Sequence, residues 1–452
     1  MKPLKTLSFI FGAIALLALL CWVFPAQGIQ VGTTHLEFPS LADVLQTDNP
    51  EKAMPQLSAE ELLAQQLREM EMQEEQAFHT FCRTSHLRFA FPDDDTRFFA
   101  PLFQALDSAK IQRMRIVHYG DSQLEGDRIT GVIREHLQQR FGGMGPGMLP
   151  LVQNIGSIHT GQSCSAELPY GLVFGPDSLR GHDNRYGPMG QVTYLDGTAH
   201  MGIWARSNDS LRCHRFDRIT VMGEGPSLSI QVKNGQRTAG TTLRQTFHLA
   251  DTVARTSLTL SGTANIYGIL VDGETGVCMD NIPMRGCSGT IFTGIRQSLL
   301  TDFYQGENVR LIIYQYGGNS VPYLRDNKGI GTYAAQVERQ IRHLRQCAPQ
   351  AQVLMIGPSD MSTRQHGEWI TYPMLPTIID SLRTAANRAG AAYWDMYQVM
   401  GGHNSMAQWC HESPALAGPD HIHFTMKGAD RVADLFYKAL MVYYDYYTKH
   451  SL

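Results

Sequence analysis

The sequence predicts an α/β fold with a doubly wound parallel sheet that is interrupted by an all-β module. Three observations lead to this prediction. Apolar strands alternate with amphipathic helices in two separate stretches of the chain. Between them, from about residue 150 to 272, short strands follow one another with frequent turns. Of the 452 residues, 43% are hydrophobic, which is enough for a sizeable core.

The first α/β stretch is short. Ile111–Tyr119 is typical of a β-strand, and Ile129–Phe141 shows helical periodicity before a glycine-rich end. Gly120-Asp121-Ser122 lies between them, so we expect Ser122 where a strand ends and a helix begins.

The second α/β stretch begins after about residue 273. Its strands are predicted to end at one edge of the sheet, where doubly wound folds bind their ligands. The predicted strands are Val309–Tyr316, Val353–Ile356 and Ala391–Trp394, and the predicted helices are Thr332–Gln346, Pro373–Arg388 and Thr425–Tyr443.

The middle stretch carries strand patterns of period two. Leu228, Ile230 and Val232 alternate with polar residues and lead into Asn234-Gly235, a strong hairpin signal. Two further strands are expected around Leu258–Leu260 and Ile266–Val271. We therefore expect an all-β module here.

The N-terminus predicts export from the cytoplasm. Lys2 and Lys5 precede Leu7–Phe24, an apolar run about 27 Å long as a helix, just enough to span a bilayer. The lysines favour a cytoplasmic N-terminus and an inner-membrane anchor. A cleaved signal peptide is the alternative, because Ala26-Gln27-Gly28 offers small residues at a cleavage site. Either interpretation predicts a periplasmic or cell-envelope location.

A tether and a helical arm are expected next. Ser58–Arg83 is rich in helix formers, and Leu62, Leu63, Leu67 and Met70 have the spacing of a docking face. The expected organisation is an anchor or signal (1–27), a tether and helical arm (28–90), a first α/β part (91–149), a β-module (150–272) and a second α/β part (273–452).

Charge and cysteine content exclude some classes of function. Lys plus Arg is 38 and Asp plus Glu is 42, so the chain has no overall basic character and we expect no nucleic-acid partner. The eight cysteines contain no CxxC pair and match no zinc pattern. We expect neither a metal nor an organic cofactor.

Ser122 is the candidate nucleophile. A serine at the rim of a sheet is exposed, and the N-terminus of a following helix favours a developing oxyanion. The alternative is structural, since Ser122 and Glu125 fit a Ser-x-x-Glu capping box.

Asp420 and His423 are the candidate orienting acid and base. A serine needs a base, and the base needs a third group to fix its tautomer. An Asp three residues before a His can place both on one loop. His421 is a competing base, and a helix-entry loop capped by Thr425 is the structural alternative.

Two glycine-containing loops complete the pattern. Asn319 follows Gly317-Gly318 after an apolar strand and offers an amide donor, although a simple turn would use the same residues. The loop around Gly286 offers a backbone N–H group.

The order of these four blocks resembles the SGNH (GDSL-type) hydrolase superfamily over roughly residues 111–145 and 273–445. The resemblance implies a three-layer α/β/α, flavodoxin-like domain, a catalytic triad of Ser122, Asp420 and His423, and an oxyanion hole made by Ser122, Gly286 and Asn319. Ser320 departs from the pattern, because the family usually has Asp there, and we expect this to alter local support. Gly289 and Gly190 are alternatives to Gly286.

Ser122 and Gly286 are 164 residues apart. A crossover between parallel strands needs only about a dozen residues or somewhat more. This layout is similar to bacterial peptidoglycan O-acetylesterases and O-acetyltransferases, which carry an inserted carbohydrate-binding-type β-sandwich. The stretches FGGMGPGMLP (141–150) and Val399–Met406 add to the likeness.

This resemblance implies a serine esterase that removes O-acetyl groups from an envelope polysaccharide such as peptidoglycan, through an acyl-enzyme. The first alternative is an O-acetyltransferase that receives acetyl from a membrane-bound acyltransferase partner. Others are a lipase and a non-catalytic carbohydrate-binding envelope protein.

Overall fold

The computed structural model describes residues 3–25, 27–32, 34–40, 44, 59–207, 209–233, 236–240 and 243–450. It divides into two compact units, Met1–Glu74 and Glu75–Leu452. Lys2, Ala26, the Asn234-Gly235 turn and most of the predicted tether lie outside the described residues.

The first unit contains the predicted apolar helix. α1 (Pro3–Val23) is followed by β1 (Ile29–Val31) and β2 (Thr34–Leu36), which pair in antiparallel fashion. Across the described ranges, no helix combines the length and apolar character that crossing a membrane requires. The predicted membrane anchor is therefore not confirmed.

The predicted helical arm is present, and its predicted docking face remains a prediction. α3 (Ala59–Thr84) leaves Leu62, Leu63, Leu67 and Met70 exposed. In the second unit, the end of this helix packs on α11 (Met426–His450) through aromatic rings: Phe78 stacks on Tyr446 with ring centroids 3.7 Å apart. Aromatic side chains near the end of α3 thus make the contact with α11.

The second unit contains the predicted parallel sheet. Its strand order is β13-β4-β14-β15-β18-β3, in which all neighbours pair in parallel except β3, which is antiparallel to β18 at the edge. Strands β13 and β3 were not predicted. The strands are β3 (Phe89–Ala90), β4 (Met114–Gly120), β13 (Val277–Pro283), β14 (Val309–Gln315), β15 (Gln352–Ile356) and β18 (Ala392–Trp394).

Helices cover both faces of this sheet. Successive side chains of a strand point to opposite faces, and in β4 Ile116 and Val117 accordingly belong to different hydrophobic cores. Helices α6, α7 and α8 pack on the Val117 side, and α4, α5 and α11 pack on the Ile116 side. This is a three-layer α/β/α arrangement. The helix bounds are α4 (Ala100–Asp107), α5 (Thr130–Phe141), α6 (Gln297–Gly306), α7 (Asn327–Cys347), α8 (Leu375–Arg388), α9 (Met396–Met400) and α10 (Ser405–His411).

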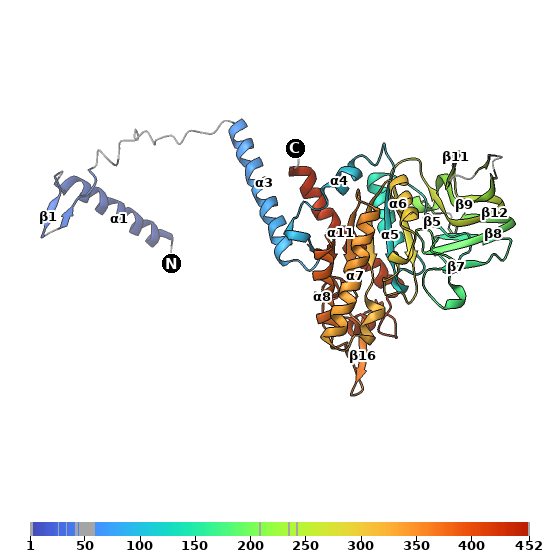
Figure 1. Cartoon of the computed structure of the whole chain (residues 1–452). Coiled ribbons are helices and arrows are strands. Elements are labelled where there is room, and N and C mark those ends of the chain that lie inside the picture. The colour runs from blue at the N-terminus through green and yellow to red at the C-terminus, as the bar shows by residue number, and fades with distance from the viewer. Residues whose placement is uncertain are drawn as a thin grey trace. The chain divides into compact units, whose positions relative to one another are not determined.

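The middle stretch folds into strands, as predicted, but they form a single hydrogen-bonded sheet and not a sandwich of two separate sheets. The two strands expected within 258–271 are one long strand, β12 (Arg255–Asp272), which pairs with β5, β8 and β9. Register shifts in β12 bend the sheet, so that it wraps around a core of its own. Figure 1 shows these antiparallel strands on one side of the unit and α7 and α8 on the other. The other strands are β5 (Gly147–Leu149), β6 (Thr160–Cys164), β7 (Tyr170–Leu172), β8 (Gln191–Ala205), β9 (Phe216–Val232), β10 (Arg237–Ala239) and β11 (Arg244–Val253).

The chain enters and leaves the antiparallel sheet at a crossing made by glycines. After α5, the carbonyl of Gly142 accepts a 2.9 Å hydrogen bond from the N–H of Val277, at the start of β13. Gly276 has a φ of +90°, and a Cβ there would lie 2.0 Å from the backbone nitrogen of Gly143. Only glycine allows the two segments to pass this closely. Both sheets belong to one compact unit, and the predicted limits at 91, 150 and 273 remain predictions.

Candidate active site

The register of the parallel sheet brings three predicted site loops to one edge. Gly120 at the end of β4 lies beside Pro283 of β13 on one side and Gln315 of β14 on the other. The loops that follow these three residues carry Ser122, Gly286 and Asn319. All three line one cavity of about 760 Å³ at the carboxyl ends of the strands, as doubly wound folds predict.

Ser122, His423 and Asp420 form a continuous hydrogen-bonded relay. Ser122 Oγ lies 2.8 Å from His423 Nε2, and His423 Nδ1 lies 2.7 Å from Asp420 Oδ2. Asp420 Oδ1 accepts the backbone N–H groups of Ile422 and His423 at 3.0 and 3.1 Å. Burial works to raise the Asp420 pKa, but these hydrogen bonds bring the pKa below its ordinary value. Asp420 therefore stays ionised and fixes the orientation of the imidazole.

The local structure around Ser122 differs from the prediction. Ser122 begins a short 3₁₀ turn, Ser122–Leu124, and α5 starts only at Thr130, so the serine is not at the N-terminus of a helix. The alternative interpretation, a capping box, does not form at these residues: the Glu125 carboxylate pairs with Arg285, and the Ser122 hydroxyl faces His423. The hydroxyl is therefore paired with the His423 imidazole and does not cap a helix.

His421, the competing base, points elsewhere. Its backbone adopts a φ of +56°, and its ring stacks on Trp369 in β17 (Glu368–Thr371), with ring centroids 4.0 Å apart. The structure thus brings His423, and not His421, to Ser122.

Gly286 is the best placed of the three candidate glycines. It lines the same cavity as Ser122, and its N–H group donates to no acceptor in the part of the chain that the structure describes. Gly190 lines a different, neighbouring cavity, and Gly289 packs against the rings of Tyr314 and Tyr316. An unoccupied N–H group facing the cavity is what an oxyanion hole requires.

Asn319 reaches the cavity with its amide already engaged. Its Nδ2 donates to Asp121 Oδ2 at 3.2 Å and to the carbonyl of Cys287 at 3.1 Å. Burial raises the Asp121 pKa to about 6. Ser320, the departure from the family pattern, donates its N–H to the carbonyl of Gly317 and so closes the turn. Donation from Asn319 to an oxyanion requires its amide to share or exchange one of these bonds.

Two positioning residues were not predicted from the sequence. The Gln123 side chain donates to the carbonyl of Ile422 at 2.7 Å and accepts the N–H of Phe424 at 3.3 Å. Arg128 donates to the carbonyls of Phe424 at 2.7 Å and Ser122 at 3.3 Å. Both side chains join the loop that carries His423 to the segment that follows Ser122. Their only sequence signal was closeness to Ser122, and nothing in the pattern showed that they turn inward.

The cavity is open at its rim. Tyr323, which is 80% exposed, borders it after β14, and Arg285 borders it after β13. Arg285 also borders a second cavity of about 410 Å³, which is lined mainly by residues of 146–191 and so lies against the antiparallel region. The two cavities adjoin at Arg285.

Comparison with solved structures gives the fold a precedent. A peptidoglycan O-acetylesterase matches 77% of this chain and 96% of its own with a TM-score of 0.63 and 19% identity. A family two carbohydrate esterase from Cellvibrio japonicus is 12% identical over 64% of this chain and 98% of its own, with a TM-score of 0.24. A GDSL-like lipase from Parabacteroides merdae is 13% identical over 37% of this chain and 74% of its own, with a TM-score of 0.27. No protein-family model matches the chain, and no curated protein matches its sequence.

The first of these structures shows the fold of the chain. The match covers 96% of the peptidoglycan O-acetylesterase and 77% of this chain. The predicted resemblance to SGNH hydrolases of this type is therefore confirmed at the level of the fold.

Proposed function

We propose that the protein is a serine esterase that removes O-acetyl groups from a cell-envelope polysaccharide. The observation that carries this proposal is the Ser122–His423–Asp420 relay at the floor of an open cavity. A hydroxyl paired with an oriented imidazole is the arrangement that nucleophilic acyl transfer requires.

The proposed reaction has two steps. His423 Nε2 takes the proton of Ser122 Oγ as the oxygen attacks the ester carbonyl, and then gives it to the departing sugar hydroxyl. A water then attacks the acetyl-serine, with His423 again accepting and returning a proton, and acetate leaves. In both steps the carbonyl oxygen carries negative charge beside the Gly286 N–H and the Asn319 amide. Removal of one such donor typically lowers the rate about 10²–10³-fold.

The substrate class is inferred from the cavity and from the neighbour in fold. An open rim with an exposed Tyr323 ring suits a sugar on a polymer better than an enclosed acyl chain. The structural neighbour is a peptidoglycan O-acetylesterase, and peptidoglycan is our first candidate polymer. The basic and apolar N-terminus supports a location outside the cytoplasm, in the periplasm or cell envelope.

The test compares wild type with Ser122→Ala on a nitrophenyl acetate and on O-acetylated peptidoglycan. Ser359→Ala is the matched control, because Ser359 lines the same cavity outside the relay. We expect Ser122→Ala to lose activity on both substrates by about 10⁴-fold or more, and Ser359→Ala to keep it. Equal hydrolysis by wild type and Ser122→Ala would contradict the proposal and favour a carbohydrate-binding protein.

An O-acetyltransferase is the second candidate, because the relay is accessible to more than water. The His423 side chain is 38% exposed, so an acetyl-serine could be attacked by a sugar hydroxyl. Incubation of the wild type with an acetyl ester and an oligosaccharide distinguishes the two. Acetylated oligosaccharide supports the transferase, with a membrane acyltransferase as the expected donor; acetate alone supports the esterase. A preference for long-chain esters would indicate a lipase.

A further inference from the structure

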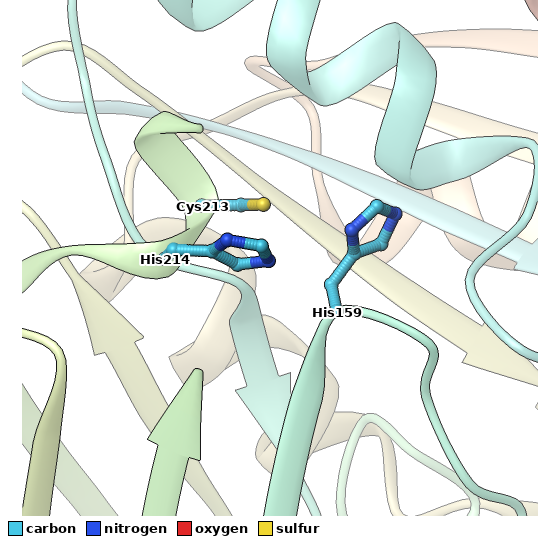
Figure 2. Close-up of side chains that lie close together, drawn as sticks. All are labelled: His159, Cys213 and His214. Carbon is cyan, nitrogen blue, oxygen red and sulfur yellow. The ribbon is translucent and has the colours of Figure 1, made fainter. Parts of the chain in front are cut away.

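A second group of reactive side chains lies outside the relay. His159 directly precedes β6, and Cys213 and His214 lie in a short 3₁₀ turn, Arg212–His214, between β8 and β9. Figure 2 shows that the Cys213 thiol and the His214 ring both point toward His159. The three come from two loops far apart in sequence, which explains why no spacing motif revealed them.

The geometry of the group suits a metal ion. One potential ligand atom from each residue lies within 4.8 Å of the others. Ligand atoms of a tetrahedral zinc site lie about 3.3–3.5 Å apart, given Zn–N of about 2.0 Å and Zn–S of about 2.3 Å. Small side-chain rotations would therefore complete the coordination without a change in the backbone.

The hydrogen bonds of His214 leave one nitrogen for a ligand. His214 Nδ1 lies 2.6 Å from Asp209 Oδ1. His214 is 3% exposed, and its Nε2 is buried without a partner among the described residues. A carboxylate on one imidazole nitrogen with the other left for the metal is the usual arrangement of a ligating histidine. A buried polar atom without a partner is unfavourable, and a bound cation would offset this.

Charges of both signs surround the group. The Arg134 guanidinium acts most strongly on Cys213, and the carboxylates of Asp127, Glu135 and Asp209 oppose it. Arg134 is itself paired with Asp127 at 2.7 Å. Zinc binding would release the Cys213 thiol proton to solvent and leave the thiolate bound.

We propose that His159, Cys213 and His214 bind one zinc ion, with water as the fourth ligand. One thiolate with two imidazoles is a donor set that zinc prefers. The ion fastens the loop before β6 to the turn before β9. That first loop includes Ser157, which lines the second cavity, and Gly126, four residues after Ser122, accepts a 2.9 Å bond from Ile158 in the same loop. The role is structural: the ion holds this wall of the second cavity in place.

The test measures metal binding directly. The purified full-length chain is stripped with a chelator, titrated with Zn²⁺ by calorimetry, and titrated with Co²⁺ by absorption spectroscopy. We expect one Zn²⁺ per chain and a thiolate-to-cobalt charge-transfer band. Cys213→Ser should lose that band and weaken zinc binding by about 100-fold or more, and Asp209→Asn should weaken it by about 10–100-fold.

The matched control is Cys347→Ser. Cys347 is also a buried free thiol, and its Sγ lies 3.7 Å from Nε2 of His343. Among the described residues, however, no third potential ligand completes a metal-binding group there. We expect its zinc affinity and cobalt spectrum to equal those of wild type. If circular dichroism shows Cys213→Ser to be misfolded, the partly exposed His159→Gln replaces it, with the same expected loss.

The proposal is wrong if the wild type takes up no zinc, or if Cys213→Ser and Cys347→Ser bind it alike. Ser122→Ala should bind zinc as wild type does, so the outcome is independent of the proposed esterase activity.

Discussion

Polar and charged side chains gather at both ends of strand β4, but they are buried at one end and partly exposed at the other. At the amino end, the Arg115 guanidinium is fully buried and bonds the carboxylates of Asp272 and Asp280, the latter at 2.5 Å. At the carboxyl end, the side chains of His423 and Asp420 are 38% and 48% exposed beside Ser122. Only the second set meets solvent and a cavity.

The comparison shows that burial distinguishes charged groups that stabilise the fold from polar groups that can reach a substrate. Arg115 joins β4 to β12 and β13, and so ties the parallel sheet to the antiparallel one. Its charges cannot reach a substrate, and removal of one partner leaves the others uncompensated in the interior. The relay contributes little to stability, but it can exchange protons with a reactant. Variants at the two ends should therefore affect different measurements.

The largest expected effect is on activity, from Asp420→Asn. The variant keeps the shape of the side chain but loses the charge that orients the His423 imidazole. We expect kcat to fall by about 10²–10⁴-fold, with little change in Tm because the side chain is half-exposed. Asp434→Asn, in the pair between Asp434 of α11 and His136 of α5, is the control and should leave kcat unchanged. A small effect on kcat in Asp420→Asn would show that His423 is oriented without it.

Arg115→Leu should act on stability instead. The buried carboxylates of Asp272 and Asp280 would lose their partner, which costs about 3–5 kcal/mol in the free energy of unfolding. Urea denaturation measures this loss, and kcat per folded molecule should stay within a few-fold of wild type. Arg383→Leu, at an exposed pair with Asp380, should cost less than about 1 kcal/mol. Equal costs for the two variants would contradict the contrast.

Asp121 tests whether burial also changes the pKa of a carboxyl at the carboxyl end of β4, beside Ser122. Its folded pKa of about 6 lies above its ordinary value of 3.8, so the folded state binds the proton more tightly than the unfolded state. Its contribution to stability is therefore complete below about pH 4 and is lost as pH rises to about 6, by about 3 kcal/mol.

Asp121→Asn removes this titration. Urea unfolding of wild type and variant at pH 4 and pH 7 should show the wild type losing about 2 kcal/mol relative to the variant over that range. Parallel profiles would show that the Asp121 pKa is not raised by folding.

The smallest expected effect is that of Gln123→Met. The variant loses the bonds to Ile422 and Phe424 that hold the histidine loop, so kcat should fall about tenfold, equivalent to about 1.4 kcal/mol, with KM unchanged. Gln138→Met is the control, because Gln138 is also buried and bonds the carbonyls of Gly145 and Val277. Its stability should fall similarly while kcat is kept. A kcat loss in both variants would mean that Gln123 acts only through stability.

Most strands of the parallel sheet could be predicted because they are apolar runs between turn signals. β13 was missed because Asp280 and Asn281 interrupt its apolar pattern, and the buried Asp280 is compensated by Arg115 and by the N–H of Met148, both far away in sequence. β12 was divided in two for a similar reason, since polar and small residues such as Gly262 occupy its middle. Long-range partners decide both cases, and a local pattern does not contain them.

The candidate site was predicted from the order of its blocks, and the structure brings Ser122, Asp420 and His423 together. The short turn after Ser122, in place of a helix start, could not be predicted, because the Ser-x-x-Glu pattern fits a cap equally well. The choice between His421 and His423 depended on one left-handed backbone residue and on Trp369. The cluster of His159 and Cys213 required tertiary structure altogether.

The glycine crossing at Gly142–Gly143 and Gly276 has a consequence for how such proteins diversify. Two chain segments that are in backbone contact connect the antiparallel region to the parallel sheet. The two points at which a replacement region would be joined are therefore already adjacent. Recombination at this seam would exchange the whole antiparallel region while leaving the carboxyl edge of the parallel sheet, with its Ser122 loop, in register. The seam therefore marks where a chimera with a different antiparallel region should be cut.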